Sequence, residues 1–320
     1  MKNSSLYVLC CSAVATTAAI GADAPEFPRR PIRLVASGVG GTGDFSSRLI
    51  APHLASRLGQ AVIVDNRPGG VVPGEILVNA PPDGHTLMMA GEVIWLSPFM
   101  RKSVPFDPLR DFAPLMLVVL SPNVLVVHPS LPVNSVQDLV KLAKQKPGAL
   151  NMASSGIGNS NHLAGAIFNA MSGLDIVAIP YKGAQLAMND LNGGRVQLMF
   201  ATANASNAHV ASGRLRAIAV TTAEPTRLTP GLPTIASAGL PGYESAAKIG
   251  LFARTGTPPA VLSLIHREVT EFLKRPETVE RLFKAGVDVV GNTPQEFGEM
   301  IRGEMKIKGK IIKAAGIQMD

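Results

Sequence analysis

The chain has 320 residues, of which 46% are hydrophobic and 17% are charged, and its formal net charge is +7. This composition excludes a disordered chain, and the length allows two domains. Aromatic residues make up only 5% and the basic residues are scattered, so a nucleic-acid partner is not expected. We interpret the densest basic run, "KIKGKIIK" near the C-terminus, as a solvated helix face.

Residues 1–22 have the pattern of a secretory signal peptide. Lys2 precedes an apolar stretch, and small residues lead to a cleavage site near Ala22. A buried N-terminal helix is the alternative. Because Cys10 and Cys11 both lie in this segment, the mature chain would contain no cysteine, and therefore neither a disulfide nor thiolate chemistry. The pattern predicts a protein exported to the periplasm.

Strand-like and helix-like segments alternate along the rest of the chain. Strands are predicted at 31–36, 61–66, 86–90, 123–129, 150–155, 175–181, 196–201 and 216–222, and the last three are expected to be buried. Helices are predicted at 43–59, 134–148, 185–194, 203–213, 257–276, 278–286 and 293–316, and a glycine-bearing loop with its helix at 156–173. Such alternation is typical of parallel sheets covered by helices. In the first helix we expect Asp44 as N-cap, Gly59 as C-cap and a kink at Pro52.

A glycine cluster follows the first predicted strand. Gly38, Gly40 and Gly43 have G-x-G-x-x-G spacing, and Asp65 follows at the distance typical of a dinucleotide-binding fingerprint. Two observations count against NAD: the carboxylate of Asp44 would lie near the pyrophosphate, and export would remove the protein from the cytoplasmic nicotinamide pool. We interpret the cluster as a loop that binds another anion, with a tight turn without ligand as the alternative.

The same design occurs twice, in loops 36–44 and 154–160. Glycines let backbone amides converge, hydroxyl and amide side chains add donors, and the following helix start adds positive potential. Ligands of open α/β sheets bind at the carboxyl ends of strands, so two facing loops would form a cleft between two lobes. His162 is a further candidate donor, although a lone histidine at a helix start is more often structural. The candidates of the two loops are Ser37, Gly38, Val39, Gly40, Gly41, Thr42 and Asp44, and Ser154, Ser155, Gly156, Gly158, Asn159 and Ser160.

Enzyme motifs are missing from the sequence. Its histidines form neither an H-x-x-x-H nor an H-E-x-x-H pair, and Ser154-Ser155-Gly156 is not a nucleophile elbow. We therefore expect no catalytic residue, no metal site and no cofactor. Polar loops without a nucleophile, base or metal favour binding without turnover.

Several long segments resemble the Bug receptors, the extracytoplasmic solute-binding proteins of tripartite tricarboxylate transporters. They include "DNRPGG", "NAPPDGHTL", "VPFDPLRDFAP", "LNMASSGIGNSNHLAG" and "IPYKGAQLAMNDLNGGRVQLMF". The resemblance implies an α/β periplasmic binding protein of the Venus flytrap type, with two lobes, each a mainly parallel sheet flanked by helices, and a hinge of crossing strands. The expected division is a signal peptide at 1–22, a discontinuous first lobe at 23–123 plus 224–320, and a second lobe at 124–223.

The resemblance also implies a function. Loops 36–44 and 154–160 would hold a small carboxylate, and the partners would be two integral membrane subunits of the transporter. We expect a monomer that captures an organic anion and delivers it without a covalent step. A ligand-sensing subunit of a signalling system and a secreted enzyme using the same cleft are the alternatives.

The chain departs from the family pattern at positions expected near the cleft. Ala201 and Thr202 stand where the family often has Asp-Asn, Glu92 where a small or hydroxyl residue is common, and Lys248 where an aromatic residue often lies. Glu92 and Lys248 would tune ligand choice if they face the cleft. Otherwise they would point to solvent or pair with each other.

Overall fold

The computed structural model describes residues 27–68, 70–314 and 316–319; the predicted signal segment lies outside the described residues. The strands are β1 (Ile32–Ala36), β2 (Val62–Asn66), β3 (Thr86–Gly91), β4 (Phe112–Val127), β5 (Asn151–Ser154), β6 (Val177–Pro180), β7 (Leu198–Thr202), β8 (Arg216–Val220), β9 (Ala246–Arg254) and β10 (Asp288–Val289). The helices are α1 (Thr42–Leu58), α2 (Val72–Val78), α3 (Val93–Met100), α4 (Val136–Gln145), α5 (Ser160–Ser172), α6 (Ala184–Asn192), α7 (Ala203–Ala211), α8 (Pro259–Leu273), α9 (Pro276–Lys284) and α10 (Pro294–Ala314).

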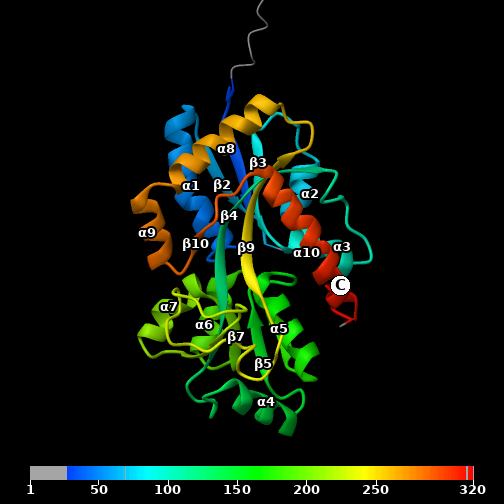
Figure 1. The fold of residues 1–320 in the computed structure, drawn as a ribbon, viewed down its shortest axis with the longest axis vertical. Helices are drawn as coiled ribbons and strands as arrows, with labels where there is room; N and C mark the ends of the chain where they lie inside the picture. Colours follow the sequence, from blue (N-terminus) through cyan, green and yellow to red (C-terminus); the bar gives the residue numbers. More distant parts are fainter. Residues whose placement is uncertain (1–26, 69, 315, 320) are drawn as a thin grey trace, which may run out of the picture.

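The two long strands β4 and β9 connect two lobes (Figure 1). Lobe 1 carries α1, α2, α3, α8, α9 and α10 around β1–β3, and lobe 2 carries α4–α7 around β5–β7. The sheet order is β2-β1-β3-β9-β4-β7-β5-β6, with β8 and β10 both paired to β4. This arrangement confirms the predicted α/β architecture with two lobes. The exact residue boundaries of the lobes stay a prediction.

The pairing pattern separates the lobes from the hinge. β1 pairs in parallel with β2 and β3, and β5 pairs in parallel with β6 and β7. At the centre, β4 and β9 pair antiparallel, from the Phe112–Arg254 pair to the Pro122–Ala246 pair. Each lobe is thus a helix-covered parallel sheet, as predicted, and the hinge is an antiparallel ribbon.

Some elements differ from the predictions. The prediction that β4 begins at residue 123 is wrong, since the strand begins at Phe112, and β9 was not predicted as a strand. β6 was predicted to be buried, but it lies at the edge of the sheet and Val177 is exposed.

Asp44 is not the N-cap of α1: the cap is Gly41, and Asp44 lies in the first turn. Gly59 is the C-cap, with the left-handed backbone that glycine favours, as predicted. The helix continues through Pro52.

An aromatic cluster joins α3, the hinge and the C-terminal helix. Trp95 of α3, Phe252 of β9 and Phe297 of α10 are buried, and their ring centroids are separated by 5.1–6.1 Å. Burial of each such side chain contributes about 1.5–3 kcal/mol. Gly250 makes room for this contact, because a Cβ atom there would lie 2.1 Å from the ring of Phe297. The cluster fixes α10 against the hinge, close to the site described next.

Candidate functional site

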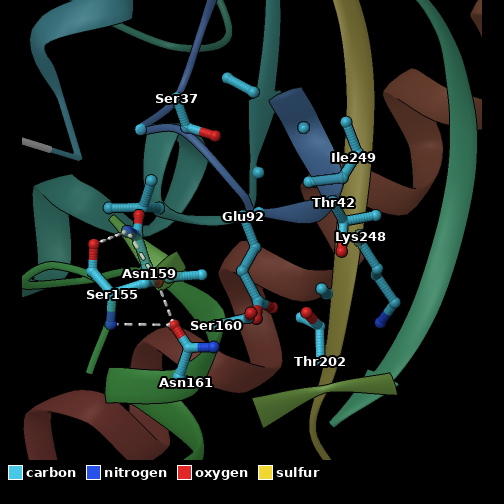
Figure 2. A pocket seen from close by; sticks show the side chains of 18 of the residues that line it. Ser37, Thr42, Glu92, Ser155, Asn159, Ser160, Asn161, Thr202, Lys248 and Ile249 are labelled. Atoms are coloured by element: carbon cyan, nitrogen blue, oxygen red, sulfur yellow. Dashed lines mark hydrogen bonds between the residues drawn. The ribbon is translucent and has the colours of Figure 1, made fainter. Parts of the chain in front are cut away.

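A pocket lies between the two lobes, beside the hinge (Figure 2). Lobe 1 contributes the loop before α1 and the segment from the end of β3 to the start of α3. Lobe 2 contributes the loop before α5 and the starts of α6 and α7. The lining residues are Ser37, Gly38, Gly41, Thr42, Gly43, Gly70, Ala90, Gly91, Glu92, Val93, Ser155, Asn159, Ser160, Asn161, Ala184, Thr202, Ala247, Lys248 and Ile249.

Helix starts converge on this pocket from both lobes. The N-cap residues Gly41 of α1, Glu92 of α3, Asn159 of α5 and Thr202 of α7 all line it, and α6 begins at the lining residue Ala184. None of these four N-cap residues makes a side-chain cap hydrogen bond. The first N–H groups of a helix lack partners within the helix, and the helix dipole makes this end positive. The pocket is therefore built to receive an anion.

In the first loop, Asp44 holds the backbone from behind. Its Oδ2 accepts a hydrogen bond from the Gly40 N–H at 3.0 Å, and its Oδ1 accepts one from Asn66 Nδ2 at 2.9 Å. Arg48 forms an ion pair with Oδ1 at 2.8 Å. The side chain is buried and lies outside the pocket lining. These bonds occupy the carboxylate and leave the inner side of the loop to the pocket.

The second loop is held by its own polar side chains. Asn161 Oδ1 accepts hydrogen bonds from the Ser155 N–H, at 3.4 Å, and from its hydroxyl. Asn159 Nδ2 donates to the Ser155 carbonyl at 3.2 Å. His162 Nδ1 accepts from the Gly158 N–H at 3.3 Å, and burial lowers the pKa of this histidine. A neutral His162 thus supports the loop and adds no positive charge.

One buried hydroxyl of the lining has no hydrogen-bond partner among the described residues. Thr202 is 4% exposed, and its Oγ1 is buried without a hydrogen-bond partner among the described residues. Ser154 Oγ is also buried and unpartnered, but Ser154 lies outside the lining. An unpaired buried hydroxyl costs free energy unless a ligand or water completes it.

Glu92 and Lys248 take part in a buried charge cluster, which we call the quartet. Lys308 Nζ of α10 lies 2.5 Å from Glu92 Oε2 and 3.1 Å from Glu304 Oε1. Glu304 also binds Lys248 Nζ, and its Oε2 accepts a hydrogen bond from Trp95 Nε1 at 2.9 Å. Glu92 and Lys248 therefore neither point to solvent nor pair with each other. Both line the pocket while α10 supplies their partners.

Each central member of the quartet is held in its charged form. Burial alone would lower the pKa of Lys308, but the carboxylates of Glu92 and Glu304 raise it well above its ordinary value. Burial alone would raise the pKa of Glu304, but Lys308 and Lys248 keep it below its ordinary value. Lys308 and Glu304 are thus ionised at neutral pH, and each forms an ion pair with another member of the quartet.

Glycines of the two lobes approach each other at the pocket. Gly183 has φ +122°, and a Cβ atom there would lie 2.8 Å from the carbonyl oxygen of Val39. A Cβ atom on Gly38 would lie 3.3 Å from the Cα of Gly183. Gly70 of lobe 1 faces the Ile157 carbonyl of lobe 2, 2.9 Å from where its Cβ atom would be. These contacts describe a closed form in which backbone meets backbone.

The structure brings together part of the predicted site. The predicted residues in the lining are Ser37, Gly38, Gly41, Thr42, Glu92, Ser155, Asn159, Ser160 and Lys248. Those outside it are Val39, Gly40, Asp44, Ser154, Gly156, Gly158, His162 and Ala201. Val39 is 50% exposed at the loop tip, and Ala201 is buried in the core of lobe 2.

Other lining residues were not named as site candidates, although Gly43 belongs to the predicted loop 36–44 and Thr202 was expected near the cleft. They are Gly43, Gly70, Ala90, Gly91, Val93, Asn161, Ala184, Thr202, Ala247 and Ile249. Ala90–Val93 and Thr202 follow or end β3 and β7, so the rule that ligands bind at the carboxyl ends of strands could have identified them. No local pattern marks the residues of β9.

Two further searches cover the part of the chain that the structure describes. No helix there combines the length and the apolar character that crossing a membrane requires. No three His, Cys, Asp or Glu side chains there are grouped so that they could hold a metal ion.

Comparison with known proteins shows the family. Residues 46–317 match the family described as tripartite tricarboxylate transporter family receptor. Protein BugT of Bordetella pertussis is 31% identical over 312 residues, which cover 95% of each chain. The structure described as R. palustris Rpa4515 with adipate is 35% identical with a TM-score of 0.86, over 91% of this chain and 99% of that chain. MatC (Rpa3494) from Rhodopseudomonas palustris with bound malate is 25% identical with a TM-score of 0.85, over 89% of this chain and 100% of that chain. The chain belongs to the tripartite tricarboxylate transporter receptor family, in which the Bug proteins are its relatives.

Proposed function

We propose that this protein is a periplasmic receptor that captures a small carboxylate between its lobes and delivers it to integral membrane subunits of a transporter. The observation that carries the proposal is the convergence of uncapped helix starts on one pocket. The family is one of binding proteins and not of enzymes. The adipate and malate named for two relatives support a carboxylate as the ligand class.

The binding step follows from the lining. Backbone N–H groups at the starts of α1 and α5 would donate to the carboxylate oxygens, one set from each lobe. The Thr202 hydroxyl, at the start of α7, lines the same pocket and would donate a further hydrogen bond. A ligand held by both lobes favours the closed form over the open one, because only the closed form makes both sets of contacts. Capture, closure and release to the membrane partner require no covalent step.

A ligand screen tests this proposal. The purified mature chain, which we expect to be a monomer, is melted with a panel of C4–C6 dicarboxylates, hydroxy acids, amino acids and aromatic carboxylates. At a hundredfold excess over Kd, a ligand of the native state adds about 2.7 kcal/mol to the free energy of unfolding. At least one carboxylate should raise the melting temperature by several degrees and reduce the radius of gyration. If no carboxylate does so, the proposal fails.

A matched pair of variants links binding to the pocket. Thr202→Val removes the unpartnered hydroxyl of the lining, whereas Thr229→Val removes another buried, unpartnered hydroxyl that lies outside it. Thr202→Val should weaken the carboxylate found in the screen by about two- to tenfold, the value of one net hydrogen bond. Thr229→Val should leave affinity unchanged. Equal effects of both variants would place the ligand elsewhere.

A further inference from the structure

Glu92 is an acidic residue in the lining of the candidate pocket. The residue is 2% exposed and stands at the start of α3. Lys308 binds its Oε2 at 2.5 Å, and no described residue donates a hydrogen bond to its Oε1. In Figure 2 its side chain extends toward the wall that carries Thr202 and Ser160, which line the same pocket. Oε1 is therefore an acceptor without a donor among the described residues, on a side chain that lines the pocket.

The lining offers no free cation to match a second negative charge on the ligand. Glu92 and Lys248 are the charged residues among those that line the pocket. The ammonium group of Lys248 is bound to Glu304, which also binds Lys308, so the two lysines are balanced by two carboxylates. The helix starts of α1 and α5 can receive one ligand carboxylate. A second ligand carboxylate would meet Glu92 and be repelled.

Packing holds Glu92 in this position. Lys308 and Glu304 are one turn apart on α10, and the aromatic cluster of Trp95, Phe252 and Phe297 fixes that helix against α3 and β9. If Lys308 moved away, the buried carboxylate of Glu92 would lose its ion-pair partner, which is strongly unfavourable. The carboxylate therefore belongs to the formed site.

We propose that the pocket selects monocarboxylates whose second polar group is a hydrogen-bond donor, a hydroxyl or an ammonium, over dicarboxylates of the same length. Glu92 Oε1 accepts the hydrogen bond from that group, while the helix starts hold the carboxylate. The proposal deepens the proposed function and rests on it. It gives this chain a ligand class different from the adipate and malate named for two relatives.

Two matched probe series test the selection by calorimetry on the mature chain. The six-carbon series is adipate, 6-hydroxyhexanoate, 6-aminohexanoate and hexanoate; the four-carbon series is succinate, 4-hydroxybutanoate, 4-aminobutanoate and butanoate. In the series that binds, the hydroxy or amino acid should bind at least about tenfold tighter than the dicarboxylate. The hydroxyl or ammonium group donates a hydrogen bond to Glu92, whereas the second carboxylate of the dicarboxylate is repelled by it. The hydroxy and amino arms show which donor the site prefers. The inference is overturned if the dicarboxylate binds as tightly as the hydroxy acid and the amino acid. It is also overturned if none of the probes binds.

Variants attribute the selection to Glu92. Glu92→Gln should reduce the preference over the dicarboxylate at least about tenfold, whereas Glu244→Gln, an exposed glutamate outside the lining, should leave the preference unchanged. If Glu92→Gln does not fold, the double variant Glu92→Gln with Lys308→Met keeps the cluster neutral and is measured in its place. An unchanged preference in the folded variant overturns the inference. Selective binding of dicarboxylates would overturn this inference and leave the proposed function standing. If no carboxylate in the wider screen binds, the inference and the proposed function are both wrong.

Discussion

Thr42 Oγ1 of lobe 1 donates a hydrogen bond to Asn204 Oδ1 of lobe 2 at 2.9 Å. The two residues are 162 positions apart and lie at the starts of α1 and α7. Thr42 lines the pocket and Asn204 does not. The bond joins the lobes beside the site, so it exists only when they are closed. It makes a latch that contributes to closure independently of the ligand.

Asn204→Ala should release this latch. One net hydrogen bond contributes about 0.5–1.5 kcal/mol, and the closed form would lose that amount relative to the open form. Ligand affinity should fall about two- to tenfold, because the closed form becomes less favourable. The free energy of lobe folding should stay unchanged, and the pocket lining stays intact. Calorimetry with the carboxylate found in the screen measures the loss.

Asn207→Ala, on the same helix, is the control for the latch. Asn207 makes no cross-lobe hydrogen bond among those that the structure describes, and it lies outside the lining. Its removal should leave affinity unchanged. If the two variants bind alike, the Thr42–Asn204 bond does not contribute to closure.

Gly70→Ala should hinder closure by steric contact. Gly70 has φ +63°, and its Cβ atom would lie 2.9 Å from the Ile157 carbonyl oxygen of the other lobe. Gly173, with φ +65°, has nothing within 4 Å, so Gly173→Ala suffers the same backbone strain without the clash. Both variants should lose stability by roughly 1 kcal/mol. Gly70→Ala alone should also weaken ligand binding, by at least about tenfold if the clash costs about 1.4 kcal/mol. Equal affinities in the two variants would mean that Gly70 does not approach lobe 2 in the bound state.

Glu304→Gln should destabilise the fold. The change keeps the shape of the side chain but removes the carboxylate that Lys248 and Lys308 share. The side chains of Glu304, Lys248 and Lys308 are all largely buried. Removing one partner from a buried ion pair typically costs about 3–5 kcal/mol. Urea unfolding measures this loss. Glu299→Gln, an exposed position on the same helix, should change stability by less than about 0.5 kcal/mol. A small loss at Glu304 would mean that the quartet is solvated.

The sequence predicts the two glycine-bearing loops because their signals are local. A β-branched or apolar strand, a glycine cluster and an amphipathic helix follow each other within about twenty residues. The rule about strand ends then places both loops at one cleft. The lining residues Ser37, Thr42, Ser155 and Ser160 were found in this way.

The hinge and the quartet have no such local signal. Pro114 and Pro122 interrupt the pattern of β4, and Gly250 interrupts that of β9, yet both strands are formed by long-range antiparallel pairing. The interpretation of "KIKGKIIK" as a solvated face is wrong for Lys308, because that side chain turns inward to Glu92, 216 residues away. Only the packing of α10 on α3 and β9 brings these charges together.

Acidification should lower the stability of this protein through three histidines that are buried or partly buried. Burial lowers the pKa values of His53, His162 and His209 below the ordinary value of 6.5. Above pH 6.5 these side chains are neutral in both the folded and the unfolded chain and contribute no pH dependence. Below pH 6.5 the unfolded chain takes up protons first, so the free energy of unfolding should fall as the pH decreases toward the folded-state pKa values.

Urea unfolding at pH 7.5, 6.5 and 5.5 measures this slope, in a range above the ordinary pKa values of the carboxylates. His162→Asn keeps an acceptor for the Gly158 N–H but cannot titrate, so its slope should be shallower than that of the parent. Carboxylate affinity should not rise between pH 7.5 and 6.5, because a neutral His162 gives the pocket no positive charge. A parent that gains stability on acidification, or an affinity that rises with the protonation of His162, would show that this histidine is charged in the folded protein and serves the anion directly.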